Sequence, residues 1–329
     1  MWDPLQHLYE KIKREGGFVN AHAHLDRAFS VIIDDFIKES GNVHKNLQEK
    51  WKLLDKYKKE TKEETFYKNI TKVLKLQKQQ NINHCLSFID CDDVVQEKAL
   101  FAAKKAKVFA QEELKLNFLI ACQTLKGVIQ KNARKWFEFS LEYVDIIGGL
   151  PAIDRGFEQE HIDILLMAAK QTGKRVHVHV DQLNTAEEKE TELLARRTIA
   201  HGLEGKVTAI HGISIAAHPV KYRQELYKLC YDAGLSFVAC PTAWLDSKRN
   251  ESLTPTHNSV TPIDEMVPAG LTVALGSDNI FDIYKPFSDG HMATELRVLL
   301  EANHFYEIDE LVKIATANGK KVLGITEYV

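Results

Sequence analysis

Two pairs of histidines could do chemistry, because in each pair a single apolar residue separates the two imidazoles. One pair is His22 with His24, and the other is His177 with His179. In a β-strand, residues i and i+2 point to the same side, so His22 and His24 can reach one common point. Neutral imidazole is the commonest metal ligand among protein side chains. The pattern therefore indicates a metal site, with structural hydrogen-bonded histidines as the alternative interpretation.

Further polar groups end two other apolar runs of the chain, at His211 and at Asp278. If all these runs are strands of one parallel barrel, their C-terminal ends meet at the mouth, where barrel enzymes keep their catalytic groups. The joint placement of histidines and an aspartate at four strand ends is more informative than either pair alone. His177 would lie two residues deeper than His179, inside the barrel. We therefore predict that His177 is a hydrogen-bonded core histidine.

The elements that would position these groups are eight short apolar runs rich in β-branched residues. Such runs, separated by segments of helical period, are typical of parallel strands that are buried on both faces. The predicted strands cover residues 18–25, 84–90, 117–123, 144–151, 175–181, 207–212, 236–241 and 272–278. Segments 159–172 and 220–233 have helical periodicity, and Gly234 is placed to end the second of them. We predict an α/β fold, a (β/α)8 TIM barrel.

The chain of 329 residues is interpreted as one domain, because α/β barrels of about 250 residues or more fold as single units. No linker rich in Gly, Ser or Pro and no internal repeat divides it. The connection between the first two predicted strands is longer than one helix needs, so we expect a helical insertion near residues 36–57 at the mouth. The predicted domain is a single barrel over residues 1–329.

Composition and charge exclude several classes of protein. The net charge is −3, and the lysines of segment 45–62 alternate with acidic residues, so we expect no nucleic-acid partner. The five cysteines are scattered and include no CxxC pair, which favours a reducing compartment over disulfides or a thiolate zinc site. No signal peptide and no apolar run of about 20 residues is visible. We therefore expect a cytoplasmic protein, without membrane contact, whose partner is a small-molecule substrate.

An ordered set of motifs extends along nearly the whole chain. It consists of AHAHLDRAF (21–29), FIDCDD (88–93), ACQ (121–123), DIIGGLPAID (145–154), HVHVDQ (177–182), IHG (210–212), VACPTAWL (238–245), TPIDEMVPAGLTVALGSDNIFD (261–282) and ATANGKKVLGI (315–325). These motifs resemble the amidohydrolase superfamily and, within it, the cytosine-deaminase-like metal-dependent hydrolases. The resemblance implies a TIM barrel of the metal-dependent hydrolase type. The chain would lack the β-sandwich domain that usually flanks this barrel.

The resemblance also implies roles for the strand-end residues. His22, His24, His179 and Asp278 match the ligands of a mononuclear site, which holds one divalent metal ion, zinc or iron. His211 matches the residue beside the catalytic water. Homo-oligomerisation is common in the group, although the sequence carries no interface signal.

Two glutamines bear on the substrate. Gln123 matches the position at which the group holds the substrate ring with an amide, which donates and accepts hydrogen bonds at once. Gln182 stands where the group has its catalytic glutamate, three residues after the histidine of the fifth strand. A neutral amide cannot titrate, so it cannot carry a proton to a ring nitrogen. This departure favours a reaction other than ring deamination.

The remaining candidates for substrate binding come from the loops that follow the predicted strands. They are Arg27, Asp90, Trp244, Asn279 and Asp282. Each has structural hydrogen bonding or packing as its alternative interpretation.

Together, these features predict an amidohydrolase that acts on a carbon–nitrogen bond, other than a peptide bond, in a small heterocyclic or cyclic amide or amine. A divalent metal would activate water, Asp278 would accept the proton, and His211 would stabilise the oxyanion as a hydrogen-bond donor. The first alternative is a deaminase of a cytosine, pterin or triazine ring. The others are a phosphoesterase barrel, since DNase-like barrels also begin with an HxHLD strand, and a metal-binding protein that has lost turnover.

Overall fold

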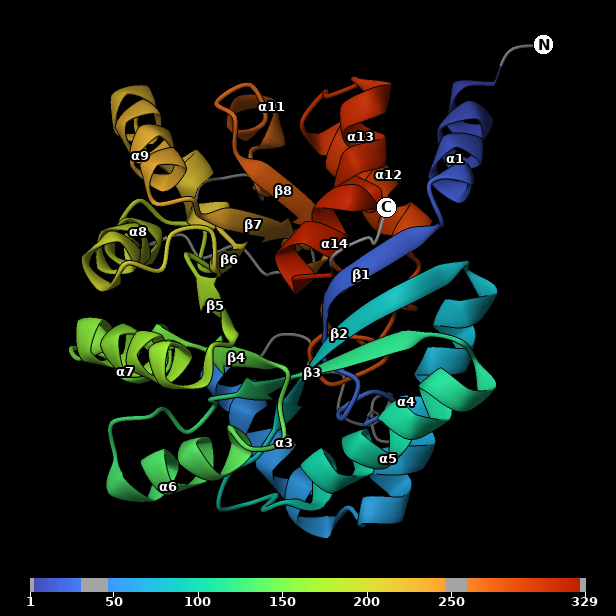
Figure 1. Cartoon of the computed structure of the whole chain (residues 1–329), viewed down its shortest axis with the longest axis vertical. Helices are drawn as coiled ribbons and strands as arrows, with labels where there is room; N and C mark the ends of the chain where they lie inside the picture. The colour runs from blue at the N-terminus through green and yellow to red at the C-terminus, as the bar shows by residue number, and fades with distance from the viewer. Residues whose placement is uncertain (1–2, 31–46, 246–258, 326–329) are drawn as a thin grey trace.

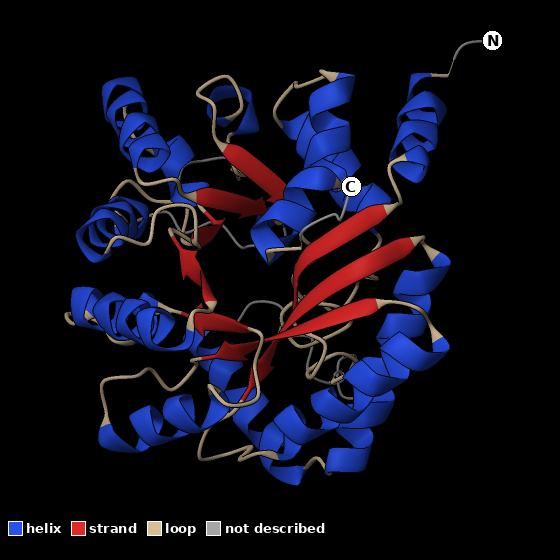
Figure 2. Ribbon diagram, in the orientation of Figure 1, coloured by secondary structure: helices blue, strands red, loops and turns tan. Residues whose placement is uncertain are grey.

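The computed structural model describes residues 3–30, 47–245 and 259–325, and its centre is an eight-stranded sheet in which each strand is parallel to its neighbour. The strands follow one another around the sheet in chain order. They are β1 (Phe18–Ala23), β2 (Ile82–Asp90), β3 (Asn117–Gln123), β4 (Ile146–Gly149), β5 (Arg175–Val180), β6 (Val207–His211), β7 (Ser236–Ala239) and β8 (Thr272–Leu275). Figures 1 and 2 show the strands at the centre and most helices outside them. The predicted (β/α)8 TIM barrel is confirmed.

The helices connect the strands and cover the outside of the barrel. They are α1 (Pro4–Arg14), α3 (Leu47–Glu60), α4 (Glu63–Gln79), α5 (Lys98–Glu113), α6 (Lys131–Ser140), α7 (Glu158–Thr172), α8 (Glu190–His201), α9 (Val220–Asp232), α10 (Thr242–Leu245), α11 (Ile263–Met266), α12 (Met292–Ala302), α13 (Ile308–Ala315) and α14 (Ala317–Leu323), with 3-10 turns η2 (Pro151–Ile153) and η3 (Ile213–Ala217). The helices predicted at 159–172 and 220–233 are α7 and α9. Gly234, with a φ of 59°, follows α9 as predicted. Within the described ranges, no helix is long and apolar enough to cross a membrane.

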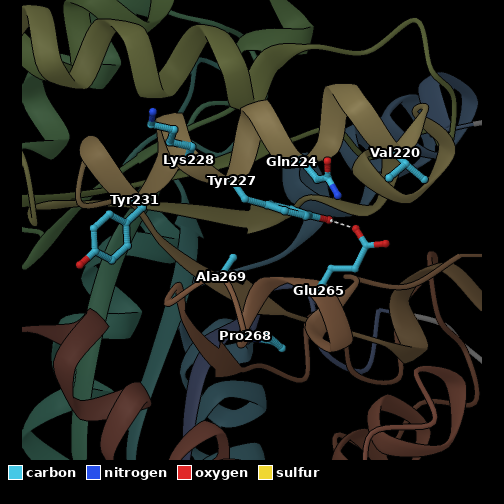
Figure 3. Close-up of a pocket in the computed structure, with 8 residues that line it drawn as sticks. All are labelled: Val220, Gln224, Tyr227, Lys228, Tyr231, Glu265, Pro268 and Ala269. Atoms are coloured by element: carbon cyan, nitrogen blue, oxygen red, sulfur yellow. Dashed lines mark hydrogen bonds between the residues drawn. The ribbon is translucent and has the colours of Figure 1, made fainter.

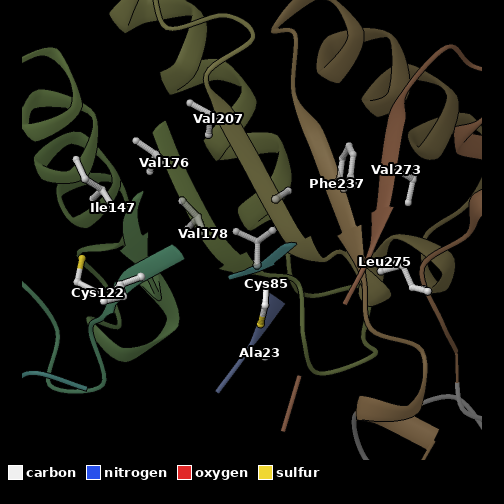
Figure 4. Close-up of a cluster of buried hydrophobic side chains, with 14 of the residues drawn as sticks. Ala23, Cys85, Cys122, Ile147, Val176, Val178, Val207, Phe237, Val273 and Leu275 are labelled. Atoms are coloured by element: carbon white, nitrogen blue, oxygen red, sulfur yellow. The ribbon is translucent and has the colours of Figure 1, made fainter. Parts of the chain in front are cut away.

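Alternate side chains of the strands form two apolar layers. One layer points outward and packs under the helices, and Figure 4 shows part of it, including Val176 and Val178 of β5. The other layer fills the barrel interior, where Val19 and Leu86 pack in one cluster with Val322 of α14. Strands buried on both faces need apolar residues on both faces, which explains the continuous apolar runs of the sequence. Because α14 seals one end of the barrel, the polar strand ends lie at the opposite end, the mouth.

The barrel closes between its first and last strands through a buried seam of hydrogen bonds. The backbone N–H of His24 donates to the carbonyl of Asp278 at 3.2 Å, and that of Ser277 donates to the carbonyl of His22 at 3.0 Å. Asn20 Nδ2 donates to Ser277 Oγ at 2.8 Å, and Asn20 Oδ1 accepts from the backbone N–H of Ser277 at 3.1 Å. A buried amide is stable only when its donor and acceptor are both paired. The seam thus fixes the polar end of β1 against the segment that follows β8.

Several strands end a few residues before their predicted ends. Strand β8, predicted over 272–278, ends at Leu275, and β5 ends at Val180. At the ends of β5 and β6 the reason is backbone conformation, because Asp181 has a φ angle of 54° and His211 one of 75°. Asp278, three residues beyond the end of β8, has a φ angle of 57°. Left-handed backbone of this kind does not continue a strand, and in non-glycine residues it concentrates at functional sites.

Helix α3 covers the described part of the predicted insertion. Residues 36–46 of that insertion lie outside the described residues, whereas residues 47–57 belong to α3. Leu54 of α3 is buried in one cluster with Leu125, Leu150 and Tyr284. These three partners follow the C-terminal ends of β3, β4 and β8. Helix α3 therefore packs on the loops of the mouth.

Candidate metal centre and active site

Two buried histidines and an aspartate lie together where the seam reaches the mouth. Nε2 of His22 is 3.3 Å from Oδ1 of Asp278, and Nε2 of His24 is 3.2 Å from the same oxygen. Metal–ligand bonds of about 2.1 Å in a tetrahedral site place ligand atoms about 3.4 Å apart. The three side chains are therefore spaced as ligands of one ion would be.

Strands β5 and β6 add two more imidazoles to this group. His22, His179 and His211 each offer a ligand atom within 4.8 Å of the others, as do His22, His24 and Asp278. His22 belongs to both sets, and its ring centroid is 4.8 Å from that of His179 and 5.6 Å from that of His211. The structure thus brings together all five residues that the sequence placed at the centre, and all five are buried.

The hydrogen bonds of these rings test whether they fit a metal ion. Nδ1 of His179 donates to the carbonyl of Gly149 at 3.0 Å, while its buried Nε2 has no hydrogen-bond partner among the described residues. A metal-ligating histidine commonly donates its other N–H in this way. His24 differs, because Arg27 donates to its Nδ1 at 2.5 Å. Ligation through Nε2 of His24 would therefore require the guanidinium of Arg27 to turn to other partners.

Burial keeps the imidazoles neutral. It lowers the pKa of His22, lowers the pKa values of His24 and His179 well below the usual value, and lowers the pKa of His211 to about 3. Burial alone would raise the pKa of Asp278, but hydrogen bonds from His22 and His24 hold that pKa well below its usual range. Neutral imidazoles beside an ionised carboxylate are the protonation states that metal binding requires.

The segment after β8 is shaped to place Asp278. A Cβ atom at Gly276 would lie 2.8 Å from Cβ of His22, so the close approach of the two segments requires glycine. Nδ2 of Asn279 donates to Oδ2 of Asp278 at 3.0 Å. One carboxylate oxygen therefore contacts the histidines while Asn279 holds the other. Asn279 thus contacts Asp278 directly, and its role in substrate binding stays a prediction.

His177 has the structural role that the sequence predicted. Its Nε2 donates to the carbonyl of Val322 in α14 at 3.0 Å, and the side chain is fully buried. Burial lowers the pKa of His177 to about 3. The prediction of a hydrogen-bonded core histidine is confirmed.

The two glutamines proposed for the substrate are buried after β3 and β5. Gln123 is 5% exposed, and its Oε1 accepts from the backbone N–H of Thr124 at 3.0 Å, which is the structural bond that the alternative interpretation requires. Gln182 is 8% exposed and lies three residues beyond His179. The side chain of Trp244, also predicted to line the pocket, lies outside the described part of the structure.

The described loop beyond Gln182 contains two glutamates, Glu187, which is exposed, and Glu188. The carboxylate of Glu188 accepts from the backbone N–H of Leu183 at 2.6 Å and from the hydroxyl of Ser214 at 2.5 Å. Glu188 is therefore engaged by Leu183 of its own loop and by Ser214 of η3, which follows β6.

The charged candidates Arg27, Asp90 and Asp282 are buried at the mouth. Besides its bond to His24, Arg27 stacks its guanidinium 5.1 Å from the centre of the Tyr284 ring. Burial alone would lower the pKa of Arg27, but the carboxylate of Asp90 and other nearby acidic groups raise it. These residues form one electrostatically connected group.

Two buried lysines were not anticipated from the sequence. Nζ of Lys58 in α3 lies 2.9 Å from Oδ2 of Asp90 and 2.8 Å from Oδ2 of Asp92. Nζ of Lys285 donates to Oγ1 of Thr242 at 2.5 Å. Both lysines occur in polar stretches, and only their burial in the folded barrel distinguishes them from solvated lysines.

The described part of the chain has two surface pockets that none of the candidate residues lines. One, shown in Figure 3, has a volume of about 580 Å³ and is lined by Val220, Gln224, Tyr227, Lys228, Tyr231, Glu265, Pro268 and Ala269. The other, of about 780 Å³, is lined by Ala152, Arg155, Glu158, Leu183, Thr185, Glu187, Glu188, Lys189, Glu190, Glu192, Leu193 and Arg196. The first lies between α9 and the segment of α11, and the second lies on the segments that follow β4 and β5 and on the start of α8. Neither is lined by a residue of the histidine cluster.

A parallel barrel with a cluster of histidines and one aspartate at its mouth defines a class of metal-dependent barrel hydrolases. The model of the amidohydrolase family matches residues 130–328. The chain belongs to the amidohydrolase family and is a hydrolase of carbon–nitrogen bonds other than peptide bonds. The predicted superfamily and class of enzyme are confirmed.

Three proteins are similar to this chain in sequence or in structure. An uncharacterized protein of Haemophilus influenzae is 44% identical, over 80% of this chain and 94% of its own length. N-isopropylammelide isopropyl amidohydrolase of Pseudomonas sp. is 26% identical, over 94% of this chain and 74% of its own length. The crystal structure of 5-methylcytosine deaminase from Klebsiella pneumoniae, 22% identical, has a TM-score of 0.83 and matches 94% of this chain and 74% of that one. This last likeness shows the fold.

Proposed function

We propose that this protein hydrolyses a carbon–nitrogen bond in a small heterocyclic or cyclic amide or amine, using one divalent metal ion, zinc or iron. The observation that carries the proposal is the convergence of His22, His24, His179 and Asp278 at the mouth. We assign these four as the ligands. The similarity to N-isopropylammelide isopropyl amidohydrolase over most of the chain supports a small heterocyclic substrate.

Asp278 is assigned as the proton acceptor. When bound, the ion supplies Lewis-acid activation of a water molecule. The low pKa of Asp278 keeps its carboxylate ionised at neutral pH, and Asn279 holds one of its oxygens in place. Asp278 can therefore take a proton from the attacking water and pass it to the departing nitrogen.

His211 is assigned as the group that stabilises developing negative charge. Because burial lowers its pKa to about 3, His211 is neutral near pH 7, and one of its ring nitrogens carries a proton. This N–H can donate to the oxygen that gains charge when the reacting carbon becomes tetrahedral. The left-handed backbone of His211 turns the chain at the end of β6, next to the other histidines.

Gln182 decides between the main proposal and ring deamination. Deamination of a cytosine-like ring requires a group that carries a proton to a ring nitrogen, and an amide does not titrate. Glu188, the nearby carboxylate, is held by Leu183 and Ser214. The residues present therefore favour hydrolysis of an amide, a cyclic amide or a substituted amine.

The experiment combines metal analysis of the purified protein with a panel of small rings. The panel contains cyclic amides, N-alkylamino triazines, cytosine, methylated cytosines and pterins, and the assay separates released ammonia from released alkylamine and from ring opening. We expect about one zinc or iron ion per chain and turnover of an amide or substituted amine without ammonia release. Bound metal with no turnover of any ring would favour a metal-binding protein that has lost catalysis. Ammonia release at an enzyme-like rate would favour the deaminase.

Gln182→Glu sharpens this choice. The substitution introduces a carboxyl group of ordinary pKa about 4.3 that can move a proton between water and a ring nitrogen. We expect new or increased ammonia release from cytosine-like rings and no gain on the native substrate, as measured by ammonia production across the panel. Gln182→Ala is the control. If the unmodified protein already deaminates a ring and Gln182→Ala does so equally well, the proton comes from another residue and the preference for amide hydrolysis is wrong.

A further inference from the structure

The peptide unit that joins Gly149 to Leu150, at the end of β4, is hydrogen-bonded on both sides. Its carbonyl, on Gly149, accepts from Nδ1 of His179 at 3.0 Å. Its N–H, on Leu150, donates to Nε2 of His161 in α7 at 3.2 Å. Nδ1 of His161 donates in turn to Oδ2 of Asp154 at 2.7 Å. One chain of hydrogen bonds, which we call the His179 relay, thus connects a proposed metal ligand with a carboxylate on the far side of β4.

The chemistry of the backbone fixes the position of each proton in the relay. A carbonyl oxygen only accepts, so Nδ1 of His179 carries a proton and Nε2 of that ring has a lone pair. A backbone N–H only donates, so Nε2 of His161 is the acceptor and its proton lies on Nδ1. All three donors therefore point away from His179 and toward Asp154. Nε2 of His179 has no hydrogen-bond partner among the described residues, as expected for a ligand atom.

The far end of the relay carries a negative charge in a mostly buried setting. The side chain of His161 is fully buried, and that of Asp154 is 9% exposed. Burial lowers the pKa of His161, so its ring is neutral. Burial alone would raise the pKa of Asp154, but the hydrogen bond from His161 lowers it, so the carboxylate is ionised at neutral pH. Oδ2 of Asp154 also accepts from the backbone N–H of Val128 at 2.8 Å, which fixes it against the loop after β3.

Two glycines make room for the relay. Helix α7 packs against β4 and β5 (Figure 1). A Cβ atom at Gly149 would lie 2.2 Å from Cδ1 of Leu165, one turn beyond His161 on α7. A Cβ atom at Gly127 would lie 2.2 Å from Oδ1 of Asp154. Glycine at both positions therefore permits the close approach that the hydrogen bonds of the relay need.

We propose that Asp154 and His161 are positioning residues for the metal centre, which orient His179 through the Gly149–Leu150 peptide unit and strengthen Nε2 of His179 as a ligand. Hydrogen bonds that share one direction polarise each other, and a carboxylate at the far end draws the protons of the relay toward it. The partners of a ligating histidine fix its orientation and raise its basicity. The inference deepens the proposed function and rests on its assignment of His179 as a ligand. The alternative is that the pair only fastens the loops after β3 and β4.

The first test measures the affinity for zinc of two variants. His161→Leu removes both hydrogen bonds of the ring, and Asp154→Asn removes the charge but retains an acceptor. Each metal-free protein is titrated with zinc in competition with a chromogenic chelator. We expect the Kd for zinc to rise about tenfold in His161→Leu and by a smaller factor in Asp154→Asn. The visible absorption of bound cobalt should shift in both variants, because His179 becomes a weaker donor.

A second pair of histidine and aspartate supplies the matched control. Nε2 of His201 in α8 lies 2.9 Å from Oδ1 of Asp163 in α7, and the further partner of both side chains is Arg197 rather than a strand end. His201→Leu and Asp163→Asn should lower stability in urea and leave the Kd for zinc and the cobalt spectrum unchanged. If the relay only fastened loops, the relay variants would behave like these controls.

Nuclear magnetic resonance of the metal-free protein, with its histidines labelled with nitrogen-15, tests the relay without any ion. We expect His179 to be protonated at Nδ1, and the resonance of that proton to move upfield in His161→Leu and Asp154→Asn because its hydrogen bond weakens. Protonation of His179 at Nε2, or a resonance that neither variant moves, would overturn the inference.

The relay and the proposed function fail in different ways. An unchanged Kd for zinc in both relay variants, or an equal rise in the controls, overturns the relay even if the protein hydrolyses a ring. If the unmodified protein binds zinc but hydrolyses no ring, the proposed function fails and the affinities still decide the relay. If it binds no zinc, the proposed function fails and the resonance of His179 decides. If His161→Leu fails to fold, Asp154→Asn decides, because it retains an acceptor for His161.

Discussion

His177 and His179 lie two residues apart on the same strand, yet they belong to opposite ends of the barrel. Both are buried, and burial lowers the pKa of each. His177 gives its N–H to the carbonyl of Val322, on the helix that seals the base. His179 gives its N–H to Gly149 and keeps a second ring nitrogen without a partner in the described chain, beside His22. Depth in the barrel, rather than residue type, separates a structural histidine from a candidate ligand.

The surroundings of the two ends differ in the same way. The base is filled by apolar side chains, among them Val19, Val322 and Leu323. The mouth instead buries ion pairs such as Lys58 with Asp90. Buried charges usually cost stability, so their concentration at one end marks the end that was selected for function.

The distinction between mouth and base fails most visibly if substitution of His22 and His24 has the same effect as substitution of His177. We expect the double substitution His22→Ala with His24→Ala to remove metal from the purified protein, because it deletes two of four proposed ligands. His177→Ala should retain the metal and lose about 2–4 kcal/mol of stability, because it leaves a cavity and an unpaired carbonyl. Metal analysis and chemical unfolding measure the two effects. Full metal occupancy in the double variant would refute the site.

A smaller change at the mouth should remove catalysis without removing the fold. Asp278→Asn retains the size of the side chain but cannot accept a proton, so we expect a loss of about 10²-fold or more in kcat. The backbone bonds of the seam do not depend on the carboxylate. Circular dichroism should therefore remain that of the unmodified protein. Retained activity would end the assignment of Asp278 as proton acceptor.

The smallest expected effect is a pH dependence of the free energy of unfolding, which arises from His177 at the base of the barrel. The pKa of His177 is about 3 in the folded barrel and about 6.5 in the unfolded chain. The unfolded chain therefore binds the proton first, and the stabilising contribution of neutral His177 is complete above about pH 6.5 and lost as the pH falls toward 3. The slope is at most about 1.4 kcal/mol per pH unit.

His177→Gln tests this contribution, because glutamine can donate to the carbonyl of Val322 without titrating. Urea unfolding of both proteins, with the metal removed, should show a weaker loss of stability between about pH 6.5 and 5 for the variant. The other buried histidines contribute equally to both proteins and cancel in the difference. Identical pH dependence would show that His177 titrates normally in the folded state.

The sequence predicted the barrel and the histidine cluster because both depend on short-range patterns. An apolar run predicts a buried strand, and a polar residue at its end predicts a group at the mouth. The chain offers no such pattern for Lys58, which is buried, and Lys59, which is exposed, because they are adjacent in one charged helix. The pairing of Asn279 with Asp278 and the burial of Asp26, Asp90 and Asp282 at the mouth likewise depend on loops that meet only after the barrel has closed.

The seam between β1 and β8 has a consequence for folding. Asn20 and Ser277 are 257 residues apart in the chain, so their contact has one of the largest loop-closure entropies that this chain can meet. The proposed ligands come from both sides of the seam, so an ion would bind the closed barrel and not an opened one. Mass action then makes the ion a stabiliser of closure, by an amount that grows with its free concentration. Chelation should therefore accelerate amide hydrogen exchange first at the backbone N–H groups of His24 and Ser277.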